Sequence, residues 1–199
     1  MLDTTIRRIA ASPLERLADG VALSGISANV LTLFGFLMGI TAAILIAGEQ
    51  FRLAVLFLAL NRLADVLDGM VARRSGATAI GAFLDASLDL FVYAAIPFGF
   101  GLAHQQDALA AAFLLMGLMV ALSPALAARA LVARKGDAAP VHSFALIGHT
   151  ETFIAFVVMC LSPRWTFSPL AYFFGMLCIM SGAMRVISTV INLRAHAKS

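Results

Sequence analysis

Long apolar runs alternate with short polar stretches along almost the whole chain. An α-helix rises 1.5 Å per residue, so about 20 apolar residues are needed to cross a bilayer. The pattern predicts six such helices, at Asn29–Ala47, Phe51–Arg73, Ile80–Ala103, Ala108–Val132, Ser143–Leu161 and Pro169–Leu193. The fold class predicted from this pattern is therefore an all-α integral membrane protein with six transmembrane helices.

The first twenty residues have a different pattern. Apolar residues such as Ile6, Ile9 and Leu17 recur at helical spacing, opposite basic residues that include Arg7. This arrangement predicts an amphipathic helix on the membrane surface. A partly disordered tail is the alternative, because Pro13 interrupts the run. We therefore divide the chain into a juxtamembrane amphipathic segment, residues 1–20, and a six-helix transmembrane catalytic domain, residues 21–199.

Composition supports a membrane protein. Hydrophobic residues make up 61% of the chain and charged residues only 13%, whereas soluble domains carry about 25% charged residues. The formal net charge of +3 is small, so nucleic acid is not an expected partner.

The basic residues are distributed unequally between the predicted loops. Six helices place both chain termini on the same side of the membrane. The opposite side receives only Arg52 and Arg164. The side that holds the termini receives Arg7, Arg8, Arg16, Arg73, Arg74, Arg129, Arg134, Lys135, Arg194 and Lys198. Because positive residues favour cytoplasmic loops, we expect both termini and the loop after the second helix to face the cytoplasm.

Four aspartates lie in the second and third predicted helices, where carboxylates are costly and usually functional. Asp65 and Asp68 share one helical face, and Asp85 and Asp89 share another. Carboxylates held close together repel unless a cation neutralises them. Oxygen ligands favour Mg²⁺, Mn²⁺ or Ca²⁺ over zinc, and Mg²⁺ commonly bridges carboxylates to substrate phosphates.

The residues around these aspartates suit a phosphate ligand. Gly69 lets a ligand approach the backbone closely, and Ala72, one turn later, is also small. Arg73 offers a charged fork for a phosphate, and Gly81 allows close packing at the start of the third helix. These residues favour a site for a phosphorylated ligand over a bare ion site.

The stretch Asp65-x-x-Asp68-Gly69-x-x-Ala72-Arg73, followed after seven residues by Gly81-x-x-x-Asp85-x-x-x-Asp89, resembles the signature of the CDP-alcohol phosphotransferases. Every fixed position matches without substitution. The resemblance implies an enzyme that transfers a phosphatidyl group from CDP-diacylglycerol to the hydroxyl of a small alcohol and releases CMP. It also implies a role in phospholipid synthesis, surrounding membrane lipids and a homodimer.

The resemblance also implies roles for individual residues. Asp89 is the expected catalytic base, and the metal ligands are Asp65, Asp68, Asp85 and Asp89. Asn29 and Thr32 match a Pro-Asn-x-x-Thr pattern that contacts the nucleotide, although Ala28 replaces its proline. The expected residues for binding the CDP-linked donor are Asn29, Thr32, Gly69, Ala72, Arg73, Thr78 and Gly81.

The acceptor alcohol is not identified by the sequence. Basic residues near the cytoplasmic side could bind a phosphorylated acceptor, whereas Glu151 could favour an amino-alcohol or a neutral polyol. The polar cluster of His149, Thr150, Glu151 and Thr152 at the start of the fifth helix is interpreted as the acceptor side of the pocket. Helix capping by Thr150, with Glu151 near the helix start, is the structural alternative for this cluster. Orientation and lipid contact are the alternative for the basic loop. The candidate acceptor residues are Arg129, Arg134, Lys135, Glu151 and Arg185.

Two other functions remain open at this level. The donor could be a soluble CDP-alcohol, with a lipid as the acceptor. A six-helix cation transporter could also use intramembrane aspartates as ligands. A cation pathway, however, does not require Gly69 or Gly81, and Arg73 would hinder it.

Overall fold

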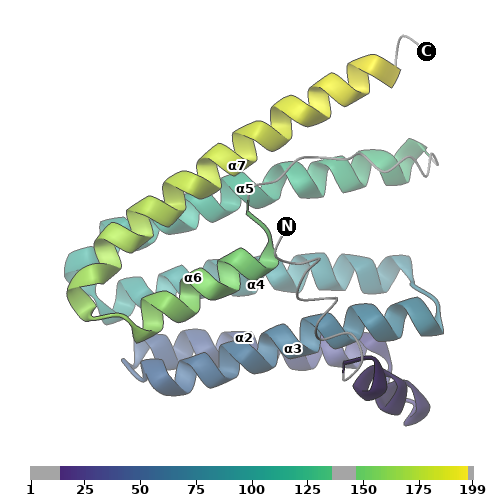
Figure 1. Cartoon of the computed structure of the whole chain (residues 1–199), viewed down its shortest axis with the longest axis horizontal. Helices are drawn as coiled ribbons and strands as arrows, with labels where there is room; N and C mark the ends of the chain where they lie inside the picture. The colour runs from purple at the N-terminus through teal and green to yellow at the C-terminus, as the bar shows by residue number, and fades with distance from the viewer. Residues whose placement is uncertain (1–13, 136–146, 197–199) are drawn as a thin grey trace.

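The computed structural model describes residues 14–135 and 147–196, and the regular elements within them are all helical (Figure 1). A short helix over residues 14–23 comes first. The long elements are α2 (Ala28–Ala47), α3 (Phe51–Ser75), α4 (Ala79–Ala103), α5 (Ala108–Lys135), α6 (His149–Leu161) and α7 (Phe167–His196). Two single turns of 3₁₀-helix, η1 (Gln105–Asp107) and η2 (Arg164–Thr166), precede α5 and α7. The predicted all-α class is confirmed.

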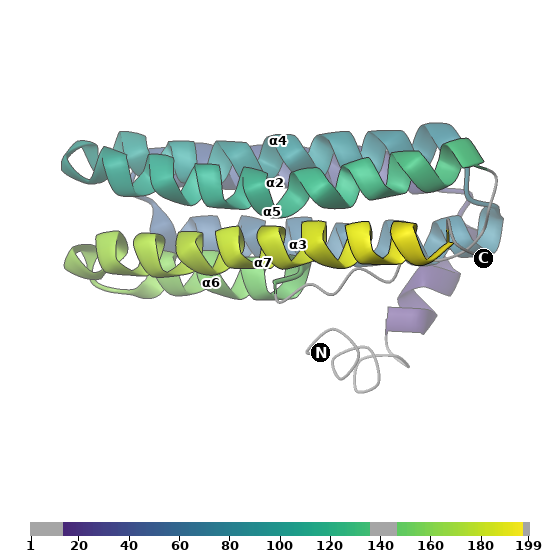
Figure 2. The same ribbon diagram turned by 90° about the horizontal axis from the view of Figure 1, so that it is seen from above.

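The long helices form two layers that lie face to face (Figure 2). One layer contains α2, α4 and α5, and the other contains α3, α6 and α7 (Figures 1 and 2). Across the layers, α2 packs against α3 and α5 packs against α7; within them, α4 contacts both α2 and α5, and α6 lies along α3. Consequently α2 contacts both of the helices that carry the aspartates.

Close packing within the bundle depends on small residues. A Cβ atom added to Gly99 on α4 would lie 2.6 Å from the backbone oxygen of Ala43 on α2. Backbone atoms cannot move aside cheaply, so only glycine allows this approach of α4 to α2. The contact helps to fix the position of α4, the helix that carries Asp85 and Asp89.

The predicted helix bounds agree with the structure except at the fifth helix. The sequence predicts its start at Ser143, whereas α6 begins at His149. Residues 143–146 lie outside the described part of the chain. Gly148 has an extended backbone and is the N-cap, and its N–H donates a 3.0 Å hydrogen bond to the carboxylate of Glu151. This Glu151 cap fixes where α6 starts.

Within residues 14–135 and 147–196, four segments are long and apolar enough to cross a membrane: Ala28–Ala47, Ala79–Ala103, Gln105–Ala128 and Arg164–Arg194. Their length and composition suit an integral membrane protein. The predicted second span, α3, is not among them; it carries six charged residues, Arg52, Arg62, Asp65, Asp68, Arg73 and Arg74. The described α6 is also short, at 13 residues. Six helices are therefore present where six spans are predicted, and four of them have the length and composition of a span.

The predicted N-terminal amphipathic helix falls partly outside the described residues, which begin at 14. The helix over residues 14–23 contains a fully buried Ala18. Asp19 forms a 2.9 Å ion pair with Arg74 at the end of α3. The short helix is therefore joined to the last turn of α3, one of the two aspartate-bearing helices.

Candidate functional site

Three of the four aspartates form a compact group. Asp65 and Asp68 come from α3 and Asp85 comes from α4, and one carboxylate oxygen of each lies within 4.8 Å of the others. The i, i+3 spacing on α3 places the first two carboxylates on the same helical face. The loop between Ser75 and Ala79 is short, so the chain returns Asp85 to the same end of the bundle.

The group has the chemistry of a site for a hard divalent cation. All of its candidate ligand atoms are carboxylate oxygens, the donors that Mg²⁺ and Mn²⁺ prefer. Thr32 on α2 donates a 2.7 Å hydrogen bond to Asp68, whose side chain is only 6% exposed. Arg62 pairs with Asp65 from one turn earlier on α3. The donor set therefore fits the cation that the sequence predicts.

Asp89 lies at one edge of this group. It shares a small cavity with Asp65, Asp68 and Asp85, but it does not belong to the set of three converging oxygens. One oxygen of Asp89 lies 3.6 Å from Nδ1 of His149 on α6. This carboxylate therefore faces both the metal group and the start of α6.

A cavity of about 280 Å³ opens beside Asp68 and Asp85, between α2, α3 and the start of α4. Six of the predicted donor-binding residues line it: Asn29, Thr32, Gly69, Ala72, Thr78 and Gly81. We call it the donor cavity. The structure thus brings predicted residues from three segments, α2, α3 and the start of α4, to a single cavity.

The start of α4 and the side chain of Arg73 border the donor cavity in different ways. Thr78 is the N-cap of α4, and its hydroxyl accepts a 3.0 Å hydrogen bond from the N–H of Gly81. A Cβ on Gly81 would lie 2.8 Å from the Asn29 side-chain oxygen, so the glycine makes room for that amide. Arg73 is not among the residues that line the cavity. It is exposed, and its guanidinium lies next to Gly69 at the rim.

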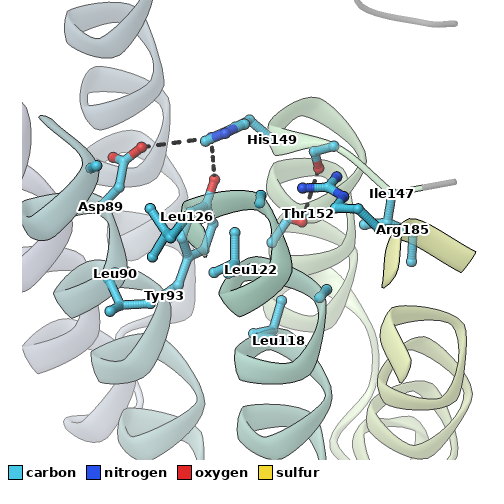
Figure 3. A pocket seen from close by; sticks show the side chains of 14 residues that line it. Asp89, Leu90, Tyr93, Leu118, Leu122, Leu126, Ile147, His149, Thr152 and Arg185 are labelled. Atoms are coloured by element: carbon cyan, nitrogen blue, oxygen red, sulfur yellow. Dashed lines mark hydrogen bonds and ion pairs between the residues drawn. The ribbon is translucent and has the colours of Figure 1, made fainter. Parts of the chain in front are cut away.

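A second cavity, of about 80 Å³, lies on the other side of Asp89. Figure 3 shows its polar side chains pointing inward from α4, α6 and α7, whereas α5 contributes leucine and alanine side chains. The polar side chains at its wall are Asp89, Tyr93, His149, Thr152 and Arg185. We call this the acceptor cavity.

The predicted acceptor residues are distributed unevenly around it. Arg185 lines the acceptor cavity. Glu151 does not, because its carboxylate caps α6 at Gly148. Arg129, Arg134 and Lys135 lie in the last two turns of α5, and their side chains are outside the described part of the structure.

Sequence reasoning assigned no role to Tyr93 or Arg62, and it placed His149 only within the polar cluster around Glu151. All three residues border the aspartates. The Tyr93 hydroxyl lies 2.9 Å from Nδ1 of His149. Nη2 of Arg62 donates a 2.9 Å hydrogen bond to Thr150. The alternative in which Thr150 caps the helix is wrong in that respect, because Gly148 is the cap and Arg62 on α3 donates to the Thr150 hydroxyl. Its other part, Glu151 near the helix start, is confirmed. Spacing could have indicated Tyr93 and Arg62, which lie one turn from Asp89 and Asp65 respectively.

Comparison with known protein families identifies this arrangement. Residues 25–191 match the model of the CDP-alcohol phosphatidyltransferase family. The chain belongs to this family. The match covers all the predicted metal-binding, donor-binding and acceptor-binding residues, and it confirms the resemblance found in the Asp65–Asp89 stretch.

Two curated relatives differ in how much of the chain they match. Inner membrane protein YnjF of Escherichia coli (strain K12) is 41% identical over 179 residues, which is 86% of this chain and 86% of the relative. Archaetidylinositol phosphate synthase of Pyrococcus horikoshii is 38% identical over 98 residues, which is 49% of this chain and 52% of the relative.

Among solved structures, phosphatidylinositol phosphate synthase (PgsA1) of Mycobacterium tuberculosis with CDP-DAG bound superimposes with a TM-score of 0.73. The identity is 18%, and the superposition covers 88% of this chain and 92% of the other. The same synthase in complex with manganese and citrate also has a TM-score of 0.73, with 20% identity and 88% of each chain covered. These structures show that the folds are alike.

Proposed function

We propose that this protein transfers a phosphatidyl group from CDP-diacylglycerol to a hydroxyl of a small alcohol, releases CMP and requires a divalent cation. The position of Asp89 carries the proposal. Asp89 lines the acceptor cavity and also borders the three-carboxylate group, two members of which line the donor cavity. An alcohol in one cavity would therefore meet a phosphorus held at the other.

Each region of the site has a part in this reaction. Asn29, Thr32 and Gly69 hold the nucleotide end of the donor, while Arg73 at the rim contacts its phosphates. Asp65, Asp68 and Asp85, with Asp89 at the edge, hold Mg²⁺ or Mn²⁺, which when bound neutralises charge on the phosphates and the leaving group. The synthase structures with CDP-DAG and with manganese support these two assignments.

The chemical step is a direct displacement. Asp89 accepts the proton of the acceptor hydroxyl, and the acceptor oxygen forms a bond to the β-phosphorus of the donor. The bond between that phosphorus and the bridging oxygen breaks, and the electron pair leaves with CMP. His149 and Tyr93 lie beside Asp89 and orient the acceptor for this step.

The acceptor that suits the cavity best is a phosphorylated polyol. Arg185 provides a guanidinium at the wall, opposite the apolar side formed by α5. A guanidinium matches the geometry of a phosphate, and Glu151 is already engaged in capping α6. The two inositol phosphate synthases among the similar proteins support this choice.

We further propose that all six long helices span the membrane and that the juxtamembrane segment, residues 1–20, lies on the membrane surface. Both termini and the donor cavity face the cytoplasm, in keeping with the distribution of basic residues. The relative named as an inner membrane protein supports this location. The protein acts as a homodimer in this proposal.

The test is an assay of purified protein in lipid nanodiscs with Mg²⁺ or Mn²⁺ and CDP-diacylglycerol. CMP release is measured against a panel of neutral polyols, amino-alcohols and phosphorylated polyols, with soluble CDP-alcohols plus diacylglycerol as a parallel arm. Release that depends on both the cation and a phosphorylated polyol is expected. If CMP is released only with a soluble CDP-alcohol and diacylglycerol, the donor is the soluble CDP-alcohol and the lipid is the acceptor. Cation flux into sealed proteoliposomes, together with no CMP release, would show a transporter in place of the enzyme.

A further inference from the structure

Arg62 lies between the metal group and the acceptor cavity. It is on α3, one turn before Asp65, and its Nη1 pairs with that carboxylate. Its Nη2 donates a 2.9 Å hydrogen bond to the hydroxyl of Thr150 on α6. A small cavity lined by Arg62, Asp65, Asp89 and His149 brings these groups together. A single guanidinium therefore joins a candidate metal ligand to the helix that forms the acceptor wall.

The start of α6 is held at several points. The N–H of Ile147 donates a 3.2 Å hydrogen bond to Ser181 on α7, and Nδ1 of His149 lies 2.9 Å from the Tyr93 hydroxyl on α4. The bond from Arg62 adds the link to α3. The helix is 13 residues long and packs along α3, with a smaller contact to α7. Thr150 is in its first turn and is 7% exposed, so its hydroxyl is a buried polar group that requires a partner. A hydrogen bond to a charged group is stronger than one between neutral groups. Arg62 thus fixes the first turn of α6 against α3.

The residue before Thr150 is His149, whose ring faces the catalytic carboxylate. Its Nδ1 lies 2.9 Å from the Tyr93 hydroxyl and 3.6 Å from Asp89 (Figure 3). A small displacement of the α6 start would move this ring relative to Asp89 and change the shape of the acceptor cavity. Reaction rates are sensitive to displacements of this size, because the reacting groups must be aligned.

We propose that Arg62 is a positioning residue that fixes His149 against Asp89 through its hydrogen bond to Thr150, and that orients Asp65 within the metal group. Arg62 thereby aligns the acceptor cavity with the metal site. This inference rests on the proposed function, since it concerns the acceptor of that reaction. It predicts that removing the bond to Thr150 impairs use of the acceptor while the donor and the metal still bind.

Two substitutions of Thr150 isolate that hydrogen bond. Thr150→Val keeps the side-chain shape and removes the hydroxyl, whereas Thr150→Ser keeps the hydroxyl. We expect Thr150→Val to raise the KM for the acceptor about tenfold, the size of one lost hydrogen bond to a charged group. The KM for CDP-diacylglycerol should stay within about twofold. Thr150→Ser should restore an acceptor KM near that of the wild type.

Arg62→Met tests both arms of the guanidinium, with Arg52→Met as the control, because Arg52 is an exposed arginine on the same helix. Arg62→Met should raise the acceptor KM and also weaken Mn²⁺ binding, measured directly from the free-ion electron paramagnetic resonance signal. Arg52→Met should change neither quantity. In the double variant Arg62→Met/Thr150→Val, the acceptor KM should match that of Arg62→Met alone, because both changes break one interaction.

The outcomes separate this inference from the proposed function. Wild-type protein that releases no CMP with any acceptor would overturn the proposed function. Active wild-type protein with an unchanged acceptor KM in Thr150→Val would overturn the positioning role alone, as would a Thr150→Ser variant as impaired as Thr150→Val. If the increases in acceptor KM caused by Arg62→Met and Thr150→Val multiply in the double variant, the two residues do not act through one interaction. If Arg62→Met does not fold, the comparison of the two Thr150 variants still decides the positioning role.

Discussion

Thr32 on α2 donates a 2.7 Å hydrogen bond to the buried carboxylate of Asp68 on α3. The same hydroxyl lies 3.0 Å from the backbone oxygen of Ala28, and Thr32 lines the donor cavity. The wall of the donor cavity and the metal group therefore share a side chain. Donor binding and metal binding should respond together to changes at Thr32.

Replacing Thr32 with valine should weaken both donor binding and metal binding. The variant keeps the side-chain volume and leaves one oxygen of Asp68 without its donor, which costs about 1–3 kcal/mol at a buried carboxylate. We expect a higher KM for CDP-diacylglycerol and a higher Mn²⁺ concentration at half-saturation. Thr41→Val is the matched control, because the Thr41 hydroxyl donates a 2.8 Å hydrogen bond to the backbone oxygen of Leu37 on its own helix. A Thr32→Val variant with unchanged Mn²⁺ binding would contradict the shared role.

Asp89→Asn should separate binding from chemistry. The amide keeps the shape of the side chain but cannot accept the proton of the acceptor hydroxyl. We expect loss of transfer, with kcat reduced by at least about 100-fold, and CDP-diacylglycerol binding largely retained, as measured by calorimetry. Full activity of Asp89→Asn would show that Asp89 is not the base that accepts the proton of the acceptor hydroxyl.

Gly99→Ala should destabilise the bundle. The added methyl group would meet the Ala43 backbone oxygen at 2.6 Å, and overpacking of this kind typically costs about 1–3 kcal/mol. Gly101→Ala is the control, because its nearest neighbour, the Cβ of Ala111, would be 3.4 Å away. Thermal unfolding in detergent should show a lower midpoint for Gly99→Ala than for Gly101→Ala, and equal midpoints would refute the close contact of α4 with α2.

The burial of His104 should make the stability of the folded protein depend on pH. His104 lies between α4 and η1, is 2% exposed and packs against Phe51 and Phe167. Burial lowers the pKa of His104 below its usual 6.5, with a smaller contribution from the nearby Arg164. Protonation of His104 is therefore less favourable in the folded state than in the unfolded state. The folded protein keeps its full stability above the pKa of the unfolded histidine and loses stability as the pH falls below that value.

The unfolding temperature should therefore decrease between about pH 7.5 and about pH 5.5, across the ordinary pKa of histidine. His104→Phe retains an aromatic ring without a titrating group, and its decrease should be smaller. Equal pH dependence in the two proteins would show that His104 does not contribute to this effect.

The local part of the site was predictable from the sequence. Asp65 and Asp68 are fixed by their spacing on one helix, and a short loop returns Asp85 to them. The donor-binding residues were predicted from the family resemblance, and the six that line the donor cavity lie in α2, in α3 and at the start of α4. Arg73 was the exception. Its spacing places it near Gly69, but nothing in the spacing shows that its side chain is exposed at the rim.

The acceptor side was less predictable, because it depends on contacts between distant segments. His149 on α6 lies far in the sequence from Asp89 on α4, and the two residues meet only through the packing of the helices. His104 lies in a short polar stretch of the sequence, yet it is buried against Phe51 and Phe167, which are both far from it in the sequence. Periodicity gives the faces of single helices, whereas these contacts depend on how the helices pack.

The central claim is tested most directly by following the phosphorus atom. CDP-diacylglycerol labelled with ³²P in the phosphatidyl phosphate is incubated with the protein, Mg²⁺ and the acceptor that gives CMP release. The account predicts that the label moves into a new lipid that contains the acceptor, in amounts equal to the unlabelled CMP, and that Asp89→Asn prevents this transfer. Label that appears in phosphatidic acid regardless of the acceptor, or that stays in the donor, would contradict it.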